Sequence, residues 1–254
     1  MKIRFIGNLL HYQPVFKTPA LRVYITNRFF TGILFWLFFC VNTVFFIRIA
    51  HLDALQLVLV GSALEAGIFL FEIPTGMVAD LYSRRLSVII GTAVIGLGTL
   101  LTGLTPNFFL ILTGQIIWGV GFTFTSGALD AWISDEIGMD NATTAYLRGS
   151  QSFNLGAVVG ISLCAVISLA GLNIPILVSG FGMLCFAIIL TLIMSEDNYK
   201  PTPSEDRQTW AHFYGTFQHT FYLTRSKKIL LTILAVGLVF GLYSEGFDRL
   251  WIAS

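Results

Sequence analysis

Hydrophobic residues are gathered in seven long runs that are separated by polar stretches. The runs contain 16 to 23 residues each and cover residues 29–47, 57–79, 87–105, 108–129, 152–170, 174–194 and 229–244. A helix of about 20 residues crosses the roughly 30 Å hydrocarbon core of a bilayer. The pattern therefore predicts an all-α polytopic membrane protein, with a bundle of six transmembrane helices followed by a seventh.

Charged residues are almost excluded from these runs. The chain of 254 residues is 55% hydrophobic and 11% charged, whereas a soluble domain has roughly 25% charged residues. Only Glu65 and Glu72 carry a charge inside the seven runs. A formal net charge of +1 gives no basis for nucleic-acid binding. Since the sequence has no phosphate loop and no His or Cys pair at metal spacing, we expect no enzyme activity, metal or cofactor.

Most cationic residues lie on one side of the predicted membrane. Thirteen of the 15 Lys and Arg residues precede residue 29, follow an even-numbered run or fall within 195–228, whereas Arg48 and Arg249 lie on the other side. Lys and Arg accumulate in cytoplasmic loops, so we expect a multi-pass protein of the cell membrane with a cytoplasmic N-terminus. The predicted organisation is a cytoplasmic segment at 1–28, a six-helix bundle at 29–194, a cytoplasmic linker at 195–228, and a seventh helix at 229–254 that starts an incomplete second bundle.

The most specific motif joins the second and third runs. Residues 76–85 read Gly-Met-Val-Ala-Asp-Leu-Tyr-Ser-Arg-Arg, in which Gly76, Asp80, Arg84 and Arg85 are the characteristic positions. This order resembles a cytoplasmic loop motif of the major facilitator superfamily, in which a glycine is followed by an acid four residues later and then by a closing basic pair.

Two positions depart from the family motif. Leu81 stands where the family usually has a cation, and Ser83 stands where it usually has glycine. The resemblance nevertheless covers essentially the whole chain, and it implies the first six-helix half of a transporter plus the seventh helix of a missing second half. Within the family, the chain is most similar to bacterial drug or macrolide-type efflux members.

The motif is predicted to form a gate. Gly76 allows a close approach between helices, and Asp80 at the membrane edge can face a helix N-terminus. We expect Arg84 to pair with an acid at the end of the fourth run, with Asp130 favoured over Asp135 because Asp130 continues the polar face of that run. Ordinary positive-inside topology is the alternative explanation of these charges.

Glu65 and Glu72 are candidates for proton coupling. They are seven residues apart, so two helical turns place them on one face of the second helix. An ionisable residue inside a bilayer is costly and marks a functional site by default. The alternative is a pair of structural acids that are hydrogen-bonded between helices.

The first and fourth runs supply candidate residues for a substrate cavity. Gln115, Trp118 and Ser126 recur at helical spacing along one face of the fourth run, and Asn42 lies beside an aromatic stripe in the first. Many proton-coupled drug antiporters of the family carry an arginine at the position of Gln115, which cannot titrate. In the fifth run, Gly156 and Gly160 predict close packing against another helix.

Together these features predict a secondary active transporter that exports amphipathic organic compounds in exchange for protons by alternating access. Its expected partners are a small-molecule substrate, protons and the lipid bilayer. Uptake of a sugar or metabolite on the same fold is the first alternative. A non-transporting membrane scaffold is the second, if the chain is naturally complete.

Overall fold

The described part of the protein is a bundle of helices. The computed structural model describes residues 18–199 together with Thr232 and Val236, and all regular structure in these residues is helical. The elements are α2 (Pro19–Phe39), α3 (Asn42–Arg48), α4 (Ala54–Leu81), α5 (Arg84–Leu104), α6 (Phe108–Thr125), α7 (Ala128–Ile137), α8 (Met139–Ile167), the 3-10 turn η2 (Ser168–Ala170) and α9 (Ile174–Ile193). They make six spans long and apolar enough to cross a membrane, which confirms the predicted all-helical membrane bundle for these residues.

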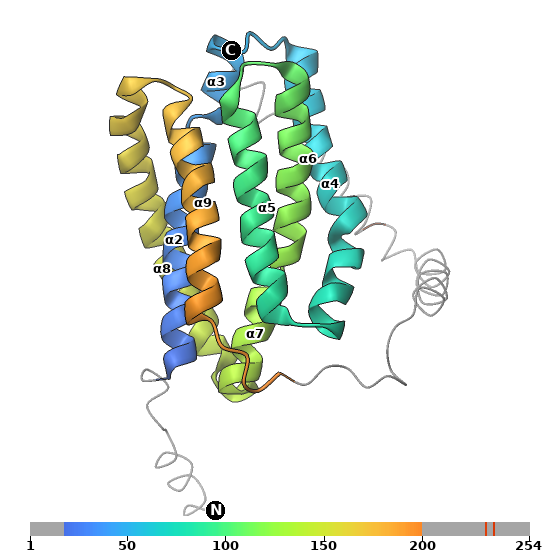
Figure 1. The fold of residues 1–254 in the computed structure, drawn as a ribbon, viewed down its shortest axis with the longest axis vertical. Helices are drawn as coiled ribbons and strands as arrows, with labels where there is room; N and C mark the ends of the chain where they lie inside the picture. The colour runs from blue at the N-terminus through green and yellow to red at the C-terminus, as the bar shows by residue number, and fades with distance from the viewer. Residues whose placement is uncertain (1–17, 200–231, 233–235, 237–254) are drawn as a thin grey trace, which may run out of the picture.

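The helices run up and down beside one another (Figure 1). The α2 helix packs along α8, α5 packs along α6, α9 joins the two pairs, and α4 covers the outer side of α6 (Figure 1). One end of the bundle contains the start of α2, the α4–α5 loop, α7 and residues 194–199, and we call it the motif end (Figure 1). This arrangement brings the charges of the loop motif and the residues after α9 to the same surface.

Local hydrogen bonds explain where several helices begin. The side chain of Asp53 accepts a bond from the backbone N–H of Gln56, and the Gln56 side chain accepts one from the Asp53 N–H, so α4 starts with a capping box. The Ser83 hydroxyl oxygen accepts from the N–H of Leu86 at the start of α5, and Asn107 caps α6 in the same way. The short connections before α5 and α6 are therefore encoded locally.

Close packing between α2 and α8 depends on glycine. A Cβ atom at Gly156 would collide with the carbonyl oxygen of Phe29, and one at Gly160 would lie 2.5 Å from the carbonyl oxygen of Ile33. The backbones of the two helices can approach this closely only because these positions lack side chains. The predicted packing role of Gly156 and Gly160 is confirmed.

Two helices begin well before the hydrophobic runs that predicted them. The α2 helix starts at Pro19 rather than at residue 29, and α8 starts at Met139 rather than at residue 152. Residues 19–28 are therefore part of the first helix that is long and apolar enough to cross a membrane. In α2 the hydrophobic run begins later than the helix, because polar residues near the start of the helix, such as the buried Asn27, face the protein interior and not lipid.

The fourth span is broken where the sequence predicted one continuous helix over 108–129. The α6 helix ends at Thr125, and α7 begins at Ala128 after Gly127, which has a φ of 72°. That left-handed conformation is easily adopted by glycine and turns the chain. The rest of the predicted seventh helix, residues 200–228 of the predicted linker and residues 1–17 lie outside the described residues; Thr232 and Val236 are helical.

Candidate substrate cavity and motif-end network

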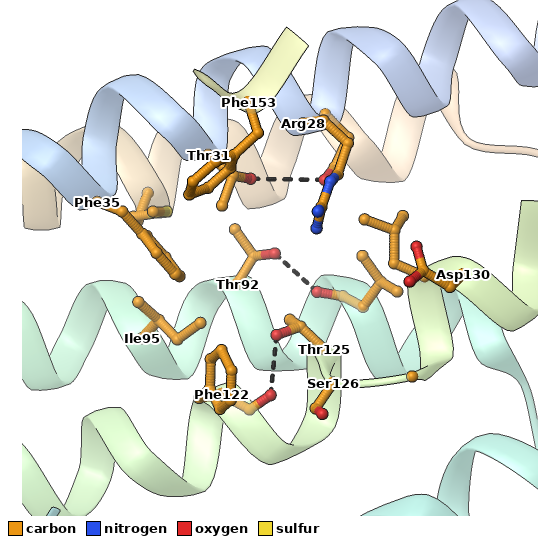
Figure 2. Close-up of a pocket in the computed structure, with 15 residues that line it drawn as sticks. Arg28, Thr31, Phe35, Thr92, Ile95, Phe122, Thr125, Ser126, Asp130 and Phe153 are labelled. Atoms are coloured by element: carbon orange, nitrogen blue, oxygen red, sulfur yellow. Dashed lines mark hydrogen bonds between the residues drawn. The ribbon is translucent and has the colours of Figure 1, made fainter. Parts of the chain in front are cut away.

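A cavity of about 290 Å³ is lined by residues from the half of the bundle nearer the motif end. Figure 2 shows the side chains that line it. Its wall is formed by residues of α2, α5, α6, α7, α8 and α9, so every span except α4 contributes. The polar residues in this wall are Asn27, Arg28, Thr31, Thr92, Thr125, Ser126 and Asp130. The cavity therefore combines a few polar groups with an otherwise apolar surface.

Arg28 projects from α2 into this cavity (Figure 2). Its guanidinium carbon lies 5.3 Å from the ring centroid of Phe153, a cation–π distance. Its Nε atom is buried without a hydrogen-bond partner, and Arg28 makes no salt bridge among the described residues. It is a cation in a membrane span, and its guanidinium donates no hydrogen bond to a described residue.

Asp130, from the first turn of α7, lines the same cavity. The hydroxyl of Tyr24 donates a hydrogen bond to its Oδ1 at 2.6 Å, and Tyr24 itself is only 1% exposed. This bond ties α2 to α7 and holds the carboxylate in place. The carboxylate of Asp130 thus has a hydrogen-bond partner in the protein, whereas the guanidinium of Arg28 has none among the described residues.

The aromatic wall of the cavity leans on a buried tryptophan. Phe35 and Phe122 line the cavity, and their ring centroids lie 5.3 and 5.5 Å from the ring of Trp118. Trp118 is 4% exposed and does not itself line the cavity. It supports the aromatic surface from behind.

Of the four residues predicted to form the cavity, only Ser126 lines it. The amide of Gln115 is buried between α6 and α5, where its Nε2 donates to Thr102 Oγ1 at 3.3 Å, and its Oε1 has no partner. Asn42 is buried at the start of α3, where its Oδ1 accepts from the N–H of Thr43 at 2.6 Å. The described structure therefore places Gln115, Trp118 and Asn42 outside the wall of this cavity.

The glutamates of α4 lie outside the cavity. Glu65 and Glu72 are both exposed on α4, the span that does not line the cavity. Glu72 nevertheless accepts a hydrogen bond at 3.2 Å from Ser126, which does line it. Glu72 is therefore one hydrogen bond away from the cavity.

Arg84 is the centre of an ionic network at the motif end. Its Nη1 donates to Asp135 Oδ2 at 2.5 Å and to the carbonyl oxygen of Ala131 at 2.9 Å, and its Nη2 lies 3.7 Å from Asp80. The predicted pairing with Asp130 is wrong. The break at Gly127 separates the polar face of α6 from α7, so Asp130 turns to Tyr24 and Asp135 meets Arg84.

The residues that follow α9 dock on the same network. Glu196 accepts bonds from the Ser83 hydroxyl and from the backbone N–H of Arg85, whose guanidinium donates to the carbonyl oxygen of Thr191. Residues 195–199 were predicted to be the start of a linker, but they lie bound beneath α4, α5 and α7. Trp132 of α7 is buried and donates to the carbonyl oxygen of Ser195.

Tyr199, in the docked residues 195–199, contacts the end of α4. Its hydroxyl donates to the carbonyl oxygen of Asp80 at 2.7 Å. Burial raises the pKa of Tyr199 above its ordinary value, the negative charge of Glu196 adds to the rise, and Arg84 opposes it.

Gly76 does not behave as predicted. A Cβ atom at Gly76 would meet no atom of the described structure within 4 Å. Helix contacts of α4 instead run through Gly67, where a Cβ would lie 3.1 Å from the carbonyl oxygen of Ile116 on α6. The expected close approach at Gly76 is therefore absent from the described part of the bundle.

The sequence missed Arg28, Tyr24 and Thr92 as residues of interest. Arg28 was counted with the cations of a cytoplasmic segment because it precedes the first hydrophobic run. The available signal was helical spacing, since Tyr24, Asn27, Arg28 and Thr31 recur at intervals of three and four. In the part of the chain that the structure describes, no group of three or more His, Cys, Asp and Glu side chains is placed to hold a metal ion.

Comparison with known proteins gives the family. The model of the Major Facilitator Superfamily matches residues 14–248. The chain is 22% identical over 209 residues (78% of this chain, 50% of the relative) to the uncharacterized MFS-type transporter YxaM of Bacillus subtilis. It is 31% identical over 77 residues (30% and 12%) to the solute carrier family 2, facilitated glucose transporter member 12, of Mus musculus. It is 28% identical over 104 residues (41% and 21%) to the protein ZINC INDUCED FACILITATOR 1 of Arabidopsis thaliana.

The chain spans half or less of the length of these curated relatives. The family match, by contrast, runs along most of the chain and includes all six described spans. It agrees with the prediction of a multi-pass membrane protein of a transporter family rather than an enzyme. The chain belongs to the major facilitator superfamily.

Proposed function

We propose that the chain is the first half of a secondary active transporter that exports amphipathic organic compounds in exchange for protons. The observation that carries this proposal is the cavity of about 290 Å³ between α2 and the helices facing it. Small-molecule sites are concave and largely apolar, with a few convergent polar groups, and they measure about 300–1,000 Å³. A second six-helix half would complete the wall and enlarge the site.

Transport would proceed by alternating access, in which two halves rock about a central site. The Arg84 network joins the ends of α4, α5 and α7 into one unit at the motif end. We propose that this unit moves as a rigid piece of the gate, with Gly76, Asp80 and Arg85 at its edge. The excess of Lys and Arg near this end supports a cytoplasmic location for it and for the N-terminus, in a protein of the cell membrane.

For proton coupling we propose Glu65 or Glu72, and the structure favours Glu72. Its carboxylate accepts a hydrogen bond from Ser126 at the cavity wall. Protonation of Glu72 would remove the negative charge that accepts this bond, and it would therefore change the hydrogen bonding of Ser126 at the cavity wall. Glu65 lies two turns further from Ser126 along α4 and does not line the cavity.

Uptake of a sugar or metabolite is the second candidate. The match to the facilitated glucose transporter member 12 favours it. Hydroxyl and amide side chains in the cavity, such as Thr31, Thr92 and Asn27, also suit a polyhydroxylated substrate. Against this candidate stands Arg28 in the cavity wall, because a neutral sugar brings no charge to pair with its guanidinium.

The two candidates differ in their effect on a proton gradient. Everted membrane vesicles that contain the full-length protein are acidified inside by respiration, and a pH-sensitive dye reports the gradient. Addition of an exported amphipathic compound should dissipate part of the gradient in vesicles with the protein and not in vesicles without it. If no amphipathic compound does so, while right-side-out vesicles accumulate radiolabelled hexose, the export proposal is wrong and uptake replaces it.

The same vesicles test the coupling residue. Glu72→Gln keeps the shape of the side chain and removes its titration, so it should abolish the substrate-induced proton movement. Ser126→Ala is the matched variant, because it removes the hydrogen bond but leaves Glu72 titratable, and it should shift the pH dependence without abolishing coupling. Unchanged coupling in both Glu65→Gln and Glu72→Gln would show that these acids are structural.

A further inference from the structure

We infer that the cavity selects a substrate with a single negative charge, and that Arg28 binds the carboxylate of an amphipathic organic acid. The inference rests on the proposed function, because it names the class of compound that the same cavity takes. It begins from an imbalance in the cavity wall. Asp130 has a hydrogen-bond donor from the protein, and Arg28 has no hydrogen-bond or ionic partner among the described residues.

The position of Arg28 makes this lack of a partner costly. Arg28 lies about 14 Å along α2 from Pro19 by helical rise, inside the first membrane span. A cation in such a place is normally paired, because its charge is poorly solvated there. The ring of Phe153 offers the guanidinium its π-face, which stabilises the charge without using its N–H groups.

The unused N–H groups of Arg28 point toward the cavity (Figure 2). A guanidinium presents its donors in a planar fork that matches the two oxygens of a carboxylate. A bound carboxylate would therefore complete both the charge balance and the hydrogen bonding of Arg28. No change in the protein's own side-chain pairing is needed for this to happen.

The rest of the wall limits the charge of the ligand to one. Among the described residues that line the cavity, Arg28 is the single Lys or Arg side chain, and Asp130 adds a negative charge of its own. A phosphate monoester or a dicarboxylate would bring a second negative charge toward Asp130 with no second cation to receive it. Like charges in a poorly hydrated site repel strongly.

The aromatic part of the wall identifies the other end of the ligand. Phe35, Phe122 and Phe153 line the cavity around Arg28, and Trp118 holds the rings of Phe35 and Phe122 in place. Such a surface favours a ring or an aliphatic chain over a sugar. The ligand class is thus an amphipathic monocarboxylate, for which 3-phenylpropionate is a small representative.

The test compares 3-phenylpropionate with its neutral amide, 3-phenylpropionamide, at about pH 7, where the acid is ionised. The full-length protein is placed in phosphatidylcholine nanodiscs, so that no anionic lipid competes, and dissociation constants are measured by calorimetry. The variants are Arg28→Gln, Arg28→Lys and Arg22→Gln. Arg22 is the matched control because it is an exposed arginine on the same helix and outside the cavity wall.

The unaltered protein should bind the carboxylate at least about tenfold more tightly than the amide. Arg28→Gln should abolish this preference, Arg28→Lys should keep the preference with weaker binding, and Arg22→Gln should change neither. Equal binding of acid and amide to the unaltered protein, no binding of either, or a preference that survives Arg28→Gln would overturn the inference. If Arg28→Gln does not fold, the comparison of acid with amide in the unaltered protein and in Arg28→Lys still tests the inference.

This inference and the proposed function can fail separately. Preference for the carboxylate through Arg28, without any effect of substrate on the proton gradient in vesicles, would support the ligand class and refute proton-coupled export. Proton-coupled export of cations or neutral compounds that is insensitive to Arg28→Gln would support export and refute the ligand class.

Discussion

Two arginines near the motif end of the bundle have opposite surroundings. Arg84 donates to Asp135 and to the carbonyl oxygen of Ala131, and it lies within 4 Å of Asp80. Arg28 contacts the ring of Phe153 and has no ionic partner in the described structure. The first arginine stabilises the protein that surrounds it, and the second retains its binding capacity for something else. Residue type and membrane depth alone do not separate these roles.

Their positions in the helices explain the difference. Arg84 is the first residue of α5, directly after the Ser83 cap, so it lies where the ends of three helices meet and where acids can be placed around it. Arg28 lies inside α2 at the level of the break between α6 and α7, where the neighbouring helices leave a cavity. A charge at a helix end can be paired by loops, whereas a charge within a span depends on what faces it.

The largest expected effect is at Arg84. Arg84→Gln should lower the free energy of unfolding by about 2–3 kcal/mol, because it leaves Asp135 and the Ala131 carbonyl without their donor; the pair is partly exposed, so the cost lies below that of a fully buried pair. The measurement is SDS-induced unfolding of the full-length protein in micelles.

A charge swap identifies the partner of Arg84. The double variant Arg84→Asp with Asp135→Arg should recover part of the stability lost by Arg84→Asp alone. The matched double variant with Asp130→Arg should recover none. Rescue by Asp130→Arg in place of Asp135→Arg would contradict the observed network.

The next effect is at Tyr24, which holds the acid of the cavity. Tyr24→Phe should cost about 1.5 kcal/mol in the same unfolding measurement, since the buried hydroxyl donates to a carboxylate. Tyr82→Phe is the control, because Tyr82 is 73% exposed and should change stability by less than about 0.5 kcal/mol. A loss at Tyr82 equal to that at Tyr24 would show that the effect is unrelated to Asp130.

Unlike Arg84→Gln, the variant Arg28→Gln should not lower the free energy of unfolding. Arg28→Gln removes an uncompensated charge from a membrane span, so the free energy of unfolding should stay the same or rise by up to about 1 kcal/mol. The comparison of the two Gln variants in one series of unfolding curves makes the point directly. A loss of stability at Arg28 as large as that at Arg84 would show that Arg28 is structural, and the contrast between the two arginines would fail.

The smallest effect is the pH dependence of the docked segment. Because the pKa of Tyr199 is raised in the folded protein above its ordinary value of 10.0, the folded state keeps a proton that the unfolded state loses. The contribution to stability is therefore complete below about pH 10 and is lost as the pH rises through the folded pKa. Tyr199→Phe should flatten this alkaline decline, measured as the difference between two curves of stability against pH. If stability declines equally at alkaline pH in the unaltered protein and in Tyr199→Phe, the ionisation of Tyr199 does not affect the stability of the docked segment.

The hydrophobic pattern predicted the helices well and their ends poorly. Each of the six described spans contains its predicted run to within one residue, because about 20 apolar residues are needed to cross a bilayer wherever they occur. The early starts at Pro19 and Met139 were missed because polar side chains in these helices face other helices. Hydropathy reports what lipid would tolerate, and it carries no information on which residues are shielded from lipid.

The sequence by itself determined the membrane class, the six spans, the loop motif that marks the family and the glycine contact between α2 and α8. Each of these follows from residues close together in the chain or from a requirement that the bilayer imposes on every helix. Only the tertiary structure decided that Asp135 pairs with Arg84, that Tyr24 holds Asp130 and that Arg28 faces a cavity. These partners lie on different helices, and the turn at Gly127 rotates α7 relative to α6. The non-helical backbone at Ser126 and Gly127 therefore changes which acid meets which base, and residue spacing along the chain does not reveal it.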